Sequence, residues 1–144
     1  MRMERECLSR GKDMNNNIDF DYCAYITRNG VMRCDDIMFN EDSFKGQNAN
    51  DIVPLVYNWD FGRDDQILGL AFLEHRTEGI YAKLSFNNDE IGQCVKDYLL
   101  NNLDKYGISF TANQIEWDGD LVKSGVIKYV HITPIEHMHT YKEE

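Results

Sequence analysis

Residues 18–34 carry the pattern of a half-buried strand followed by a tight turn. Apolar side chains occupy every second position at the start: Ile18, Phe20, Tyr22, Ala24 and Ile26. A period of two places them on one face of an extended chain. Asn29-Gly30 follows, a dipeptide that tolerates the positive φ angles of a type I′ turn. The pattern predicts a hairpin in which residues 31–34 return as the second strand.

The next stretch predicts a loop and then three strands. Residues 35–50 mix acids, Asn and Gly around a few apolar side chains, which is typical of a surface loop or a short helix. Residues 52–57 are an apolar run that contains Pro54, so we expect a strand that begins at a sheet edge or a bulge. Residues 67–75 and 79–86 predict a second hairpin, joined by a tight connection that ends in glycine.

The period of the apolar residues changes between positions 88 and 105. Five of them recur at the spacing of one helix face: Ile91, Val95, Tyr98, Leu99 and Leu103. Asn87 can cap the first turn with Glu90 three residues later, and Gly107 lies just beyond the last turn. The sequence therefore predicts one clear amphipathic helix, at about 88–105.

Extended character returns after this helix. Residues 107–117 predict a strand, residues 117–120 a turn, and residues 122–135 the last strand or a bent pair of strands. Strands thus outnumber helices along the chain. We expect a mainly β (α+β) fold, in which the single helix packs on a sheet.

The two ends of the chain lack a sustained period. Residues 1–17 mix charges with Ser, Gly and Asn and predict a flexible N-terminal arm, and residues 137–144 predict a polar tail. No internal repeat or linker interrupts the sequence between them. We therefore expect one domain over residues 18–136.

Composition and charge narrow the class of protein. The 144 residues are 42% apolar and 28% charged, as in an ordinary soluble globular domain. The apolar runs are far shorter than the roughly 18 residues of a membrane span, and no secretory h-region follows the charged start, so we expect neither an integral membrane protein nor Sec export. The net charge of −10 repels nucleic acid and anionic lipid. Neither is an expected partner.

Four cysteines are spread along the chain: Cys7, Cys23, Cys34 and Cys94. They form no C-x-x-C pair, so neither a zinc ribbon nor a redox motif is present. We expect reduced thiols. A disulfide between Cys23 and Cys34 is also conceivable, because these residues flank the predicted hairpin.

Serine and histidine supply the candidate chemistry. Ser109 follows the predicted helix in an extended segment, where it is either a nucleophile facing a groove or an ordinary strand serine. His131, His137 and His139 fall within nine residues, which makes a weak zinc site conceivable. No cysteine or acid is obviously paired with them, and tails of this kind are usually solvated. We therefore predict no metal and no cofactor.

Several segments, in order and spacing, carry a family resemblance. They are Ile52-Val53-Pro54-Leu55-Val56-Tyr57-Asn58-Trp59-Asp60, Ile67-Leu68-Gly69, Gly79-Ile80-Tyr81-Ala82, Gly107-Ile108-Ser109-Phe110 and Glu116-Trp117-Asp118-Gly119. Together they resemble the tailed-phage prohead serine proteases, capsid-maturation enzymes related in fold to the herpesvirus protease assemblin. The resemblance covers residues 18–136. It implies a compact, mostly antiparallel β-barrel-like core, with Ser109 in the position of the nucleophile.

Two departures from the family argue against catalysis. The resemblance places the general-base histidine at position 59, where this chain has Trp59, and an indole has no basic lone pair. His131 falls where phage members carry an acidic orienting residue and the herpesvirus enzymes a second histidine. It replaces the missing base only if it lies within about 3 Å of Ser109 Oγ. We also expect no extension of the kind that usually follows the last strand in the family.

Three hypotheses follow for the function. The first is a phage head structural protein with an inactivated protease fold, which binds the major capsid protein or other copies of itself in a decorating or cementing role. It would be made in the bacterial cytoplasm and reside in the virion. The second is an active prohead serine protease that uses Ser109 and His131 on scaffold or coat precursor. The third is a host or prophage protein with a coincidental β-barrel and an unrelated binding role.

Overall fold

The computed structural model of the chain describes residues 12–13, 18–47, 51–57 and 67–138. Their elements, in chain order, are β1 (Lys12–Asp13), β2 (Ile18–Asp19), β3 (Tyr22–Tyr25), β4 (Ile52–Tyr57), β5 (Ile67–His75), β6 (Ile80–Phe86), α2 (Glu90–Leu100), β7 (Tyr106–Asp118), β8 (Leu121–Pro134) and the 3-10 helix η2 (Ile135–His137). The fold is mainly β with one short α-helix in the described residues, as the sequence predicted.

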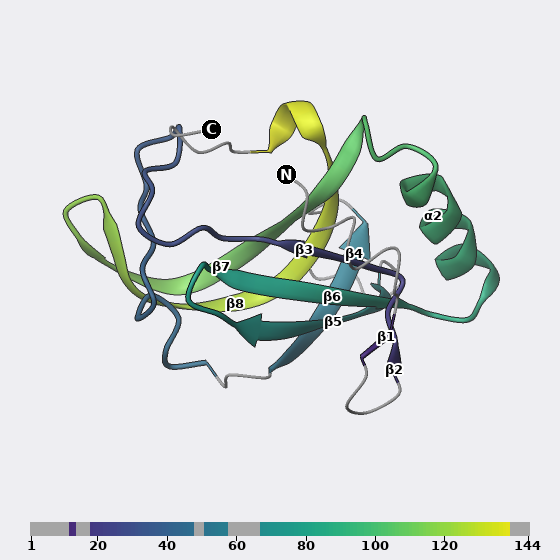
Figure 1. Cartoon of the computed structure of the whole chain (residues 1–144), viewed down its shortest axis with the longest axis horizontal. Helices are drawn as coiled ribbons and strands as arrows, with labels where there is room; N and C mark the ends of the chain where they lie inside the picture. Colours follow the sequence, from purple (N-terminus) through teal and green to yellow (C-terminus); the bar gives the residue numbers. More distant parts are fainter. Residues whose placement is uncertain (1–11, 14–17, 48–50, 58–66, 139–144) are drawn as a thin grey trace.

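Six of the strands form one curled sheet that resembles half of a barrel (Figure 1). Their order is β3-β6-β5-β4-β8-β7, and β1 and β2 pair separately with each other. All neighbours in the large sheet are antiparallel except β4 and β8, which run parallel. The long β7–β8 hairpin crosses the molecule, and its open side is the edge formed by β7.

The strand β3 does not form the hairpin that Asn29-Gly30 predicts. It pairs instead with β6, and the chain that follows stays on β6, because the Ile26 amide donates to the Ile80 carbonyl at 2.8 Å. Gly30 adopts a positive φ of 80°, but Asn29 does not have a positive φ, so the two residues do not form the predicted type I′ turn. They lead into a long loop, and the predicted strand at residues 31–34 is wrong.

The core lies on one face of the sheet. Its fully buried side chains include Leu55, Leu73, Leu84, Leu99, Ile127 and Val130. A smaller cluster of Phe20, Cys23 and Tyr81 packs separately from this core. Cys23 is disulfide-bonded, whereas Cys34 and Cys94 are exposed thiols. A Cys23–Cys34 bridge is therefore wrong, and so is the expectation that Cys23 is reduced.

The helix α2 is shorter than its apolar pattern. It begins after Asp89, not Asn87, and the Asp89 side chain accepts from the Gly92 amide at 2.7 Å. It ends at Leu100, five residues before the predicted boundary. The Asn102 side chain donates to the Tyr98 carbonyl at 2.8 Å, the acceptor that the Asn102 backbone amide would need in a further turn, and that amide donates instead to the Leu99 carbonyl at 3.0 Å.

Residues 35–47, which belong to the segment predicted as a surface loop or short helix, are mostly exposed, but four of their side chains are buried. Phe39 and Phe44 are each 3% exposed. Ser43 Oγ donates to the Val122 carbonyl at 2.6 Å, and the Gln47 amide makes two hydrogen bonds with the backbone of Ile127, at 2.9 and 3.0 Å. These side chains bond to the backbone of β8 as a neighbouring strand would, where β4 does not reach.

Pro54 sits inside β4, which is an interior strand of the sheet. The β8 strand pairs with β4 only at Leu55–Tyr57, so the first half of β4 has one partner, β5. A residue without an amide proton is tolerated there, as it is in an edge strand. The register also shifts between Leu55 and Val56, which is the bulge that the proline led us to expect.

Candidate functional site

Ser109 and His131 lie directly opposite each other on β7 and β8. Directly paired residues of antiparallel strands project to the same face, with Cβ atoms about 4.5–5.5 Å apart. His131 is 8% exposed and Ser109 is half-buried. On the far side of His131, β4 contributes Val56 at the same level. The fold therefore brings together the two site residues that the sequence singled out from distant segments.

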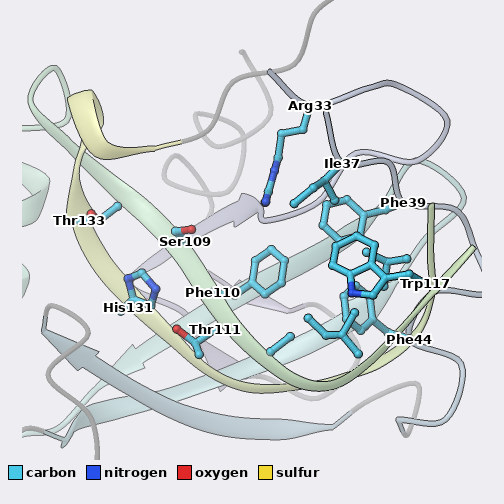
Figure 2. A pocket seen from close by; sticks show the side chains of 13 residues that line it. Arg33, Ile37, Phe39, Phe44, Ser109, Phe110, Thr111, Trp117, His131 and Thr133 are labelled. Atoms are coloured by element: carbon cyan, nitrogen blue, oxygen red, sulfur yellow. The ribbon is translucent and has the colours of Figure 1, made fainter. Parts of the chain in front are cut away.

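A groove of about 490 Å³ opens beside this pair (Figure 2). The consecutive residues 109–112 all line it. Because successive side chains of a strand point to opposite faces, this lining places the groove along the open edge of β7. Ser109, His131 and Thr133 lie at one end, and the aromatic side chains gather toward the other (Figure 2).

Three aromatic rings form the apolar wall of the groove. Phe39 and Phe44 come from the loop of residues 26–47 and Phe110 comes from β7, and their ring centroids are 5.7–5.9 Å apart. Trp117, near the hairpin turn, is 50% exposed and extends this surface. Side chains of this kind favour an apolar occupant over a strongly charged one.

Arg33 is the cation of the groove wall among the described residues, and its charge is already engaged. Its guanidinium makes two hydrogen bonds with the Asp35 carboxylate, at 2.8 and 2.7 Å. It also lies 5.3 Å from the ring centroid of Phe39. These contacts are made within the loop, and the ion pair leaves little net charge in the groove wall.

The imidazole of His131 is neutral at pH 7. Burial lowers the pKa of His131 below its ordinary value, while a hydrogen bond with the Phe110 backbone acts in the opposite direction. Among the described residues, no carboxylate contributes to this pKa shift. Within that part of the chain the ring keeps a basic lone pair without an acid that orients it, unlike the base of a catalytic triad.

The Nδ1 atom of His131 is buried and has no hydrogen-bond partner among the described residues. The Ser109 hydroxyl, although directly across the strand, does not donate to it. A general base must lie within hydrogen-bond reach of the proton that it removes. Ser109 and His131 therefore lie side by side, but no hydrogen bond joins the serine hydroxyl to Nδ1 of the histidine as it would join a nucleophile to its base.

Trp59, at the position of the expected base, lies outside the described residues, so the effect of Trp59 on catalysis stays a prediction from the sequence. The predicted arm, except residues 12–13, and the tail from residue 139 also lie outside them. Among the histidines of the conceivable zinc site, the structure describes the side chain of His131 and not those of His137 or His139. The described part of the chain holds no group of three or more candidate metal ligands.

Another buried histidine lies outside the groove. His75 ends β5, and its Nε2 atom is also buried without a partner in the described residues. Burial lowers the pKa of His75, and the charge of Asp51 partly opposes this shift.

No helix among the described residues is long and apolar enough to cross a membrane.

The loop of residues 26–47 contributes to this site in a way that its sequence pattern does not predict. Arg33, Phe39 and Phe44 belong to a polar, irregular stretch that shows no period. A signal is present, since large apolar residues recur within this otherwise polar segment, and such residues are seldom left exposed together. The sequence does not reveal, however, which surface they cover.

Comparisons of the chain with protein-family models, with curated proteins and with solved structures found no match.

Proposed function

We propose that this chain is a phage head structural protein that keeps the fold of a prohead protease, has lost catalysis, and binds the capsid shell through its groove. The observation that carries the proposal is that Ser109 and His131 are paired across the strands, yet the buried Nδ1 of His131 accepts no hydrogen bond from the serine. With Trp59 at the position of the expected base, we infer that the Ser109 hydroxyl is not activated; loss of the base from a serine protease such as subtilisin costs on the order of 10⁶ in kcat.

The arrangement of elements supports the family resemblance. Within the first segment of the resemblance, Ile52–Tyr57 form β4, and residues 58–60 lie outside the described part of the chain. The two short segments fall in β5 and around the start of β6, and residues 107–110 lie in β7. The last segment ends at the turn that joins β7 to β8, where Gly119 has a φ of 64°. The resemblance thus rests on whole strands in their order, and Trp59 supplies the reason for inactivity.

The groove supports a binding role. Its wall combines three packed phenylalanine rings with the exposed Trp117, while the polar end carries hydroxyl groups beside His131. An extended segment of the major capsid protein, or of another copy of this chain, would bury apolar side chains against the rings. Because the chain carries a charge of −10, packaged DNA would repel it, which favours the outer surface of the shell.

An active serine protease is the second candidate, and the register favours it. Ser109 and His131 are direct cross-strand neighbours, and the lowered pKa of His131 keeps its ring unprotonated. A rotation of either side chain on substrate binding would shorten the distance between the hydroxyl and the ring. Catalytic hydrogen bonds are often loose without substrate, so this candidate needs a direct test.

The test is the number of copies of this chain in purified, DNA-filled particles, measured against coat protein by quantitative mass spectrometry. We expect many intact copies per particle and the same number with Ser109→Ala. Loss of the chain from mature particles, with coat processing that stops in Ser109→Ala but continues in the control Ser124→Ala, would overturn the structural role. A fluorophosphonate probe gives an independent reading, since we expect no labelling that depends on Ser109.

A further inference from the structure

The helix α2 carries a second apolar row that the fold does not cover. Leu99 is fully buried, and Val95 and Leu100 pack against the core. Ile91 and Tyr98, however, are 65% and 50% exposed. They are seven residues apart and therefore lie on the same side of the helix, about 10 Å from each other along its axis. The exposed thiol of Cys94 lies between them.

This row continues onto the sheet. The ring of Tyr98 meets that of Tyr106, at the start of β7, edge-on with centroids 5.4 Å apart. The pKa of Tyr106 is raised, first by the hydrogen bond with Tyr98 and the charge of Tyr98, then by burial and by the charges of Tyr57 and Glu136. We call Ile91, Cys94, Tyr98 and Tyr106 the helix patch. The helix patch is one apolar surface formed by α2 and the start of β7. It lies far along β7 from Trp117, which is at the aromatic end of the groove.

An acidic row runs beside the helix patch. Glu90 and Asp97 precede Ile91 and Tyr98 by one residue each, so they form a parallel row with the same seven-residue spacing, and both are exposed. Lys96, the cation of this helix, lies 3.9 Å from Asp21, so its charge is offset. Glu136 adds a negative charge near Tyr106. The patch is therefore apolar along its centre and negative along one side.

We propose that the helix patch is a docking surface for a positively charged amphipathic segment of another protein. An apolar row flanked by carboxylates is matched by a segment that presents apolar side chains beside Lys or Arg. Tyrosine rings are well suited to such contacts, because they bury a large area and lose little conformational entropy. The inference goes beyond the proposed function and uses a different surface, so either can fail without the other.

The experiment is a titration of the isotope-labelled full chain with two synthetic 18-residue peptides, followed by NMR amide shifts and by calorimetry. Both peptides carry the same leucine positions of a helix, and the remaining positions are lysine in one and glutamate in the other. We expect saturable binding of the Leu/Lys peptide, with the largest shifts in residues 90–106, and no binding of the Leu/Glu peptide.

Variants distinguish binding at the helix patch from nonspecific apolar binding and from nonspecific electrostatic attraction. Ile91→Ser with Tyr98→Ser should weaken binding about tenfold or more, whereas Glu90→Gln with Asp97→Asn should weaken it less and remove much of its salt dependence. The matched control is Ile52→Ser with Leu70→Ser, which changes two side chains that are 48% and 44% exposed on β4 and β5. The control should bind as the unchanged chain does.

Four results would overturn the proposal. They are equal binding of both peptides, equal loss in the control variant, largest shifts along the groove, and a dimer of the unchanged chain that Ile91→Ser with Tyr98→Ser dissolves. The last result would assign the patch to a second copy of the chain. All substituted side chains are exposed, and retained amide-shift dispersion shows that each variant is folded.

Discussion

The loop of residues 26–47 and the helix α2 lie at opposite ends of the sheet and are held there in different ways (Figure 1). The loop is fastened by buried polar side chains, Ser43 and Gln47, that bond to the backbone of β8, and by two buried phenylalanine rings. The helix is regular and capped, yet it buries only Gly92 and Leu99 completely. Regular secondary structure and close attachment to the core are therefore separate properties in this molecule.

The difference has a physical basis. A helix satisfies its own backbone groups and needs the sheet only to cover one apolar stripe. An irregular loop has no such internal pairing, so a buried loop must find partners for its polar groups or lose stability. We expect substitutions in the loop to cost more than comparable substitutions in the helix.

The largest contrast should come from truncating one ring in each region. Phe44→Ala removes a side chain that packs on Phe39 and Phe110, and we expect it to lower the free energy of unfolding by about 3–5 kcal/mol. Tyr98→Ala removes a ring that is half exposed, and we expect a loss below about 1 kcal/mol. Urea unfolding of both variants measures the difference. Equal losses would show that the two regions are attached equally well.

A polar substitution tests the bonding of the loop directly. Gln47→Ala leaves the Ile127 amide and carbonyl without their side-chain partner, and we expect a loss of about 2–3 kcal/mol. The control is Gln93→Ala on α2, where an exposed side chain donates to the Asn87 carbonyl, with an expected change within about 0.5 kcal/mol. Chemical denaturation reports both values. A loss no larger in Gln47→Ala than in the control would contradict the strand-like role of Gln47.

The cap of the helix should matter less than the bonds of the loop. Asp89→Ala removes the acceptor of the Gly92 amide, and we expect a loss of about 1 kcal/mol together with fraying of the first turn. Circular dichroism and thermal unfolding measure the two effects. Asp97→Ala, in the middle of the helix, is the control and should leave the first turn intact. If both variants behave alike, Asp89 does not act through the cap.

Mild acid gives the smallest expected effect. Burial lowers the pKa of both His131 and His75 in the folded chain, whereas an unfolded histidine keeps a pKa near 6.5. At pH values between the folded-state and the unfolded-state pKa, the unfolded chain binds more protons than the folded chain does. The free energy of unfolding therefore keeps this contribution above about pH 6.5 and loses it as the pH decreases toward the folded-state pKa. Unfolding midpoints from pH 7.5 to pH 5 measure the slope.

The two histidines can be separated by substitution. His131→Gln and His75→Gln should each flatten part of this pH dependence, because each removes one group whose pKa differs between the two states. A slope that neither variant changes would assign the acid sensitivity to other groups. A slope that only His75→Gln changes would mean that the groove end of the sheet tolerates a charged imidazole.

Periodic segments were predicted well from the sequence. The strands β4, β5, β6, β7 and β8 lie at or within one or two residues of the expected ranges, because each is an apolar run bounded by turn residues. The opposition of Ser109 and His131 was suggested by the resemblance alone, since pairing between strands depends on register, which no local pattern of residues fixes.

The wrong predictions have two causes. The strand at residues 31–34 depended on which distant segment pairs with β3, whereas the length of α2 depended on a hydrogen bond between residues four apart in the chain. Gly30 has a positive φ, but β6 and not residues 31–34 is the neighbour of β3. Leu103 extends the helix pattern, yet the Asn102 side chain bonds to the Tyr98 carbonyl that the next turn would use. Local propensity gave way to a tertiary contact in the first case and to a local side-chain hydrogen bond in the second.

The parallel pairing of β4 with β8 also has a consequence for the time course of folding. Leu55 and Val130 are neighbours in the sheet but 75 residues apart in the chain. The β5–β6 hairpin, which is local, can form early, whereas β4 cannot meet β8 until a loop of that length has closed. We expect this closure to limit the folding rate. Until it occurs, β4 has an open edge, and the exposure of this edge sets the period in which the chain is most liable to aggregate.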